Sequence, residues 1–139
     1  MISWILILKL SLFGLAMGIA TALFIPSNVE GFLWPVIFII CAYLIAKNSA
    51  EMYFTTGFCL SLVNCAWIIA AHLIFFNSYM AGHAKEAEMY NNNPYHLSPQ
   101  IAMVIIGIVI GILSGLVQGL FAFIASKIVK KNRIIPFQD

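Results

Sequence analysis

The sequence predicts an all-α integral membrane protein: a four-helix transmembrane bundle in a single domain, 1–139, with antiparallel neighbours joined by short loops. Composition is the first reason, because 63% of the residues are hydrophobic and 9% are charged, whereas about a quarter of the residues in soluble domains carry charge. The second reason is that the apolar residues gather in four runs of about the length that crosses a bilayer as a helix. The third is a regular glycine repeat, typical of helices that pack closely in lipid.

The first three runs predict membrane spans at 4–25, 32–46 and 53–76. Pro26, followed by Ser27 and Asn28, ends the first span with a turn signal. Pro35 suits the first turn of the second span, where its missing N–H does no harm. The hydrophilic residues 47–51 then join the second and third spans. We therefore expect tight helical hairpins.

The fourth span, expected at 101–126 after Ser98 and Pro99, carries a glycine at every fourth position. This repeat consists of Gly107, Gly111, Gly115 and Gly119. Residues four apart lie nearly above one another in a helix, so these glycines form a flat groove, a glycine zipper, on one face. Gly14 and Gly18 form a second small face on the first span, and we expect the two faces to pack together within one chain. The groove is longer than that face, which leaves docking of another copy as the alternative.

Four polar side chains lie deep in the third and fourth spans, where lipid offers them no partner. They are Asn64, His72, Ser114 and Gln118. We expect them to form one buried polar seam between spans three and four. One interpretation is structural, namely hydrogen bonds that fix the register of the helices. The other is functional, because an ionisable group inside a membrane, here His72, is a candidate for a transport path, whereas Lys9 near a span end is expected to reach the head groups.

The region 77–99 is predicted to be a loop outside the membrane, in which residues 79–90 could form a short surface helix. His83 and Glu86 stand three residues apart there, but the histidines of the chain show no recognised metal-ligand spacing. The three cysteines lie in apolar runs without a CxxC pattern. No metal site, cofactor or disulfide is therefore predicted.

The distribution of basic residues predicts the orientation. Six lie on the side of the two termini: Lys9, Lys47, Lys127, Lys130, Lys131 and Arg133. The opposite side carries Lys85 alone. The positive-inside rule then predicts cytoplasmic termini and an external loop 77–99, in the inner (cytoplasmic) membrane of a bacterium. The basic tail 127–139 directly follows a span, so its expected partners are lipid head groups of the bilayer and not nucleic acid.

Signatures of enzymes are absent from the sequence. It contains no GxSxG, HExxH or phosphate-binding loop, and its acidic residues are all assigned to loops or the tail: Glu30, Glu51, Glu86, Glu88 and Asp139. Without a carboxylate in a span, a proton-coupled exporter is also disfavoured. The sequence thus predicts no catalytic residue. Our first interpretation is an accessory or scaffolding protein that associates through its helices with other membrane proteins or a second copy. The alternative is a small oligomeric channel or carrier with a polar path along spans three and four.

Overall fold

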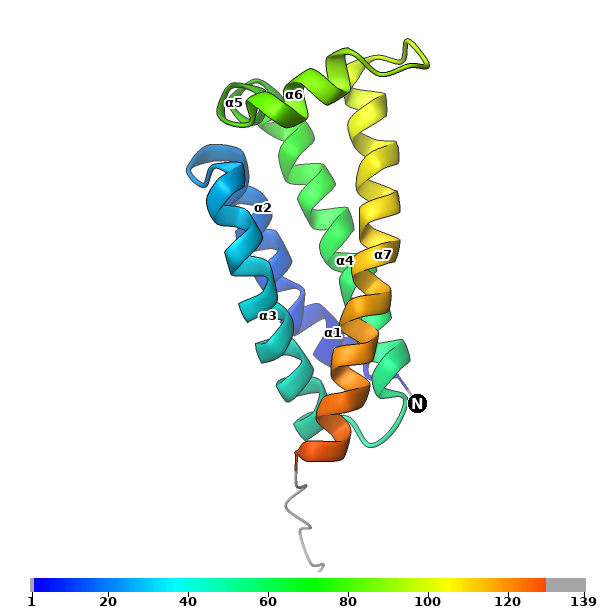
Figure 1. Ribbon diagram of the computed structural model, residues 1–139. Coiled ribbons are helices and arrows are strands. Elements are labelled where there is room, and N and C mark those ends of the chain that lie inside the picture. Colours follow the sequence, from blue (N-terminus) through cyan, green and yellow to red (C-terminus); the bar gives the residue numbers. More distant parts are fainter. Residues whose placement is uncertain (1, 130–139) are drawn as a thin grey trace, which may run out of the picture.

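The computed structural model describes residues 2–129, and these residues form helices and connecting turns without a strand (Figure 1). In chain order the helices are α1 (Trp4–Leu10), α2 (Leu12–Leu23), α3 (Ser27–Asn48), α4 (Tyr53–Ile74), α5 (Phe76–Gly82), α6 (Ala84–Asn91) and α7 (Pro99–Ile128). Four stretches are long and apolar enough to cross a membrane: Trp4–Leu23, which joins α1 and α2, and the helices α3, α4 and α7. The predicted all-α chain with four apolar spans is thereby confirmed.

The second span is longer than predicted. Helix α3 begins at Ser27, directly after Pro26, whose extended backbone precedes the first turn. Most of the expected loop therefore belongs to the helix, and Glu30 lies in its first turn. The assignment of Glu30 to a loop is wrong for this reason. Pro35 lies inside α3 and not in its first turn. At this interior position its ring removes one backbone hydrogen bond of the helix.

The first span is interrupted at Ser11, which separates α1 from α2. The hydroxyl of Ser11 donates to the carbonyl oxygen of Leu8 at 2.8 Å and accepts from Nε1 of Trp67 at 3.3 Å. A serine that bonds back to the preceding turn tends to bend a helix. The contact with Trp67 holds this bend against α4.

Helix α4 lies between α2 and α7 and packs along both. A Cβ atom at Gly14 would overlap the side chain of Asn64, and one at Gly18 would lie 3.0 Å from Cα of Ile68. Both small residues of α2 therefore face α4. The predicted contact between the glycine faces of spans one and four is wrong, because α4 occupies the place between them.

The glycines of α7 also face α4. A Cβ atom at each would lie closer than 3.0 Å to an atom of α4, and the residues met are Ile69, Cys65, Phe58 and Phe54, in the order of the glycines 107, 111, 115 and 119. The backbones approach most closely at Gly57 of α4, where a Cβ atom would lie 2.7 Å from the carbonyl oxygen of Gln118 and 3.0 Å from Cα of Gly119. Small residues on both helices thus allow this close contact.

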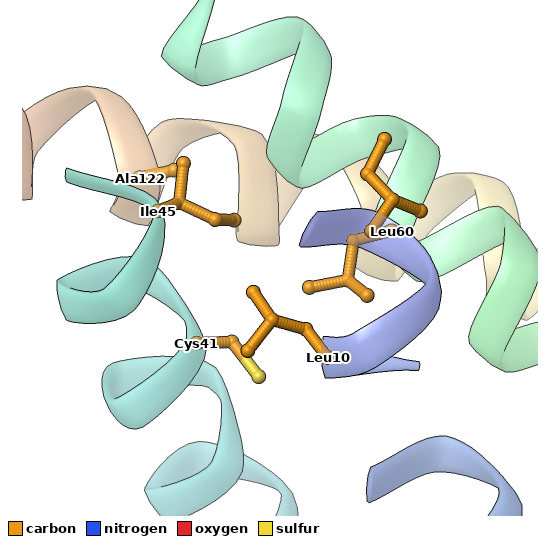
Figure 2. Packing of buried hydrophobic residues seen from close by; sticks show 6 residues of the cluster. Leu10, Cys41, Ile45, Leu60 and Ala122 are labelled. Carbon is orange, nitrogen blue, oxygen red and sulfur yellow. The ribbon is translucent and has the colours of Figure 1, made fainter. Parts of the chain in front are cut away.

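Buried apolar side chains join α1, α3, α4 and α7 at one end of the molecule. Figure 2 shows this cluster, which consists of Ile7, Leu10, Cys41, Ile45, Leu60 and Ala122. The N-terminus, the connection from α3 to α4 and the last described turn of α7 lie at this end (Figure 1). Of the predicted basic tail 127–139, residues 130–139 lie outside the described part of the chain.

The opposite end is covered by α5 and α6 (Figure 1). The expected helix at 79–90 is divided in two, with His83 between α5 and α6. Tyr79 and Tyr90 are buried there against Ala102 and Met103 of α7. The side chain of Asn93 then closes the turn before α7 by bonding the backbone of Tyr90 and Leu97. The region 77–99 thus packs onto the spans.

Candidate ligand cavity between the helices

A cavity of about 390 Å³ lies between α3, α4 and α7. Its wall is mostly apolar, formed by Phe38 of α3, Ile68 and Ile69 of α4, and Ile110 and Val117 of α7. Towards α5 and α6 it ends at Tyr79, Tyr90 and Met103. The cavity therefore extends along the spans and is covered at one end by the two short helices.

The end of the cavity near α5, here called the outer end, carries a stack of three rings. The ring of Tyr79 lies between those of His72 and His83, with centroids 4.0 Å and 4.2 Å away. The hydroxyl of Thr21 lies 2.8 Å from the carbonyl oxygen of Met17 and 2.8 Å from Nε2 of His72, so it bonds the ring to the backbone of α2. The stack thus links α2, α4 and α5.

Glu30 places a carboxylate at the same end. Its Oε1 accepts a hydrogen bond from Nε1 of Trp34 at 3.0 Å, one helical turn further along α3. Its Oε2 lies 3.7 Å from Nε2 of His83, a side chain that is only 2% exposed. Nδ1 of His83 donates to the carbonyl oxygen of Tyr79 at 3.1 Å. In the described part of the chain, Nε2 of His83 has no hydrogen-bond partner.

Tyr79 and Tyr90 present neutral hydroxyl groups to the cavity. Burial raises the pKa of Tyr79 well above its usual range, and the neighbouring Tyr90 raises it further. Burial also raises the pKa of Tyr90, although the hydrogen bond with Tyr79 opposes this shift. Neither side chain ionises at neutral pH. Because the two hydroxyl groups bond each other, one of them donates within the pair and the other keeps its proton for a further acceptor.

Three of the four residues of the predicted polar seam find hydrogen-bond partners, each on a different helix. The hydroxyl of Ser114 lies 3.0 Å from that of Ser61, which joins α7 to α4. Nε2 of Gln118 donates to the carbonyl oxygen of Phe38 at 3.3 Å and joins α7 to α3. His72 bonds α2 instead, and Oδ1 of Asn64 is buried without a hydrogen-bond partner in the described part of the chain.

These side chains therefore do not form a single seam between α4 and α7. Asn64, His72 and Ser114 nevertheless line the same cavity, whereas Gln118 is not among its lining residues. Among the other polar lining residues, sequence reasoning missed Glu30, Tyr79 and Tyr90. A signal for Glu30 was present, because Trp34 follows it by four residues and can bond it across one helical turn.

The histidines and cysteines do not gather into a metal-binding group. Within residues 2–129 no three side chains of the types His, Cys, Asp and Glu are close enough together to hold an ion. Glu86, three residues after His83, accepts a hydrogen bond from the hydroxyl of Ser27 at 2.9 Å. This bond connects α6 to the start of α3 and adds to the cover over the outer end.

Comparison with known proteins adds no assignment to this geometry: the chain matches no protein family, no curated protein and no solved structure.

Proposed function

We propose that this protein is a small carrier that binds an amphipathic molecule in the cavity between α3, α4 and α7, without a catalytic step. The cavity itself is the observation that supports this function most. Its volume of about 390 Å³ falls within the range of about 300 to 1,000 Å³ that is usual for small-molecule sites. Its mostly apolar wall with a few convergent polar groups also fits a ligand site.

Access from the lipid supports a carrier of a membrane-soluble molecule. Ile110 and Val117 line the cavity, yet they are 57% and 44% exposed on the surface of α7. These two side chains therefore form a thin wall, with one side towards the cavity and the other towards the surroundings of the helices. Helices α3 and α7 meet near Phe38 and Phe121 and diverge towards α5 and α6 (Figure 1). A ligand would enter sideways between them, from the bilayer.

A scaffolding role receives less support from the glycines on which it was based. The glycine face of α7 and the small face of α2 are both covered by α4 of the same chain. Neither leaves a groove for another helix. Association with a second copy or with other membrane proteins would have to use a different surface.

The proposal includes the arrangement in the membrane. We place the four spans as an antiparallel bundle in a bacterial inner membrane, with both termini cytoplasmic. Lys9, Lys47 and Lys127 lie in the helices whose ends meet at the end opposite α5 and α6, and Lys85 lies in α6 (Figure 1). An excess of basic residues on one side favours that side as the cytoplasmic one. The cavity then lies closer to the external side.

Filling the cavity should abolish binding of a small apolar probe. We expect the double substitution Ile110→Phe and Val117→Phe to raise the Kd of N-phenylnaphthylamine at least about tenfold, a loss of about 1.4 kcal/mol. Binding would be measured in nanodiscs as energy transfer from Trp34, which lines the cavity. The background would carry Trp4→Phe and Trp67→Phe, so that Trp34 is the sole donor.

The matched control is the double substitution Ile112→Phe and Leu116→Phe, at exposed positions of α7 that do not line the cavity. It should leave the Kd within about twofold, which is less than 0.5 kcal/mol. Transfer that persists in a Trp34→Phe variant measures probe dissolved in lipid and is subtracted. The proposal is wrong if no saturable transfer from Trp34 remains after this subtraction, or if both double variants bind equally well.

A further inference from the structure

We propose that the cavity selects a lipophilic cation, such as a substituted ammonium with an apolar body, whose charge lies against Glu30. This inference rests on the proposed binding function and adds the chemical class of the ligand. The observation that supports this inference is the charge of the residues that line the cavity. Glu30 is the one Asp, Glu, Lys or Arg among the described residues that line the cavity, so its carboxylate is the single formal charge on an apolar wall.

The carboxylate of Glu30 has no lysine or arginine as a partner in the described part of the chain. Its one close basic neighbour is the imidazole of His83, at 3.7 Å and beyond hydrogen-bond distance. Its other close contact is the indole N–H of Trp34, a neutral donor. The Glu30 side chain is 23% exposed and keeps lone pairs free for a ligand. A cation at this end would meet a carboxylate that no lysine or arginine of the described residues pairs, between low-dielectric walls that strengthen the attraction.

Aromatic rings beside Glu30 favour the same class of ligand. Trp34 and Tyr90 line the cavity together with Glu30, and the negative face of an aromatic ring attracts a cation. Both faces of Tyr79 are already covered by His72 and His83, so Tyr79 offers its hydroxyl. An anion would instead meet the carboxylate and the electron-rich rings. The outer end thus discriminates by the sign of the charge.

The rest of the cavity fits an apolar body attached to that cation. Its lining on α7 extends from Met103 to Val117, which corresponds to about 20 Å at the helical rise of about 1.5 Å per residue. Away from Glu30 and the stacked rings of the outer end, the wall is apolar except for the hydroxyl groups of Ser61 and Ser114, the amide of Asn64 and the thiol of Cys65. A purely hydrophilic cation would gain nothing from this surface.

The test compares two probes of the same shape and opposite charge, tetraphenylphosphonium and tetraphenylborate. Each would be equilibrated with nanodiscs that contain the protein, and binding to empty nanodiscs of the same zwitterionic lipid would be subtracted. We expect the protein to bind the phosphonium at least about tenfold more tightly than the borate. Glu30→Gln should remove this preference. The matched control Glu88→Gln, at an exposed position of α6 that does not line the cavity, should keep it.

Binding of the neutral N-phenylnaphthylamine to the same preparations separates this inference from the proposed function. If the neutral probe binds and the two charged probes bind equally, the selection of cations is refuted and the binding function stands. If no probe binds above the empty nanodiscs, the binding function itself fails. A Glu30→Gln protein that still binds the neutral probe and still prefers the phosphonium would show that Glu30 is not the source of the selection. If Glu30→Gln does not fold, the comparison of phosphonium and borate binding to the unaltered protein still tests whether the cavity selects cations.

Discussion

Gly57→Ala is expected to lower the free energy of unfolding by about 1 to 3 kcal/mol, the usual cost of overpacking a close contact. The added Cβ would lie 2.7 Å from the carbonyl oxygen of Gln118 and 3.0 Å from Cα of Gly119. These are backbone atoms, so the contact is relieved only when α4 and α7 move apart. Reversible unfolding in mixed micelles, followed by circular dichroism, would measure the change.

Gly31→Ala is the matched control, since it makes the same chemical change inside helix α3. A Cβ atom there would meet nothing within 4 Å. Because glycine is a poor helix former, alanine should stabilise this position by about 0.5 to 1 kcal/mol. The two substitutions are therefore expected to have opposite signs. Destabilisation of the same size at both positions would mean that α4 and α7 are not in backbone contact at Gly57.

The number and class of the helices could be predicted from the sequence because they depend on local properties. Four long apolar runs with few charges have no other stable arrangement than helices in lipid. The start of α3 could not be predicted in the same way. Ser27, Asn28 and Gly31 are typical of a turn, and Glu30 is ordinarily a loop residue. Within the helix this carboxylate accepts a hydrogen bond from the indole of Trp34 and lines the cavity.

The glycine spacing predicted a small face on α7, but it could not identify the helix that fills it. That depends on small residues elsewhere, and Gly57 of α4 allows the closest approach. The cavity was even harder to predict from the sequence. Glu30, Tyr79 and Tyr90 are far apart in the chain and come together only because α5 and α6 fold across the ends of the spans. No local sequence pattern predicts that these three residues lie close together.

Loosening the cover over the outer end should expose the cavity to water. We expect His72→Leu to raise the alkylation rate of Cys65 by a water-soluble maleimide about tenfold, in a background with Cys41→Ala and Cys59→Ala. Leucine places an apolar side chain of similar size at position 72 and removes the hydrogen bond to Thr21 and the stacking on Tyr79. Such a hydrogen bond contributes about 0.6 kcal/mol in membranes and an aromatic pair about 0.5 to 1.5 kcal/mol. Their sum of about 1 to 2 kcal/mol corresponds to roughly a tenfold shift in an opening equilibrium.

Gln118→Leu separates opening of the cover from a general loss of packing. It also removes a hydrogen bond between helices, from Nε2 to the carbonyl oxygen of Phe38, but Gln118 itself does not line the cavity and is not part of the cover formed by α5 and α6. Cys65 lines the cavity, so its alkylation reports the opening from either variant. Gln118→Leu should lower stability by about 0.6 kcal/mol and leave the alkylation rate unchanged. Equal acceleration in both variants would show that the stack of His72, Tyr79 and His83 supports the helices in general and does not act as the closure of the cavity.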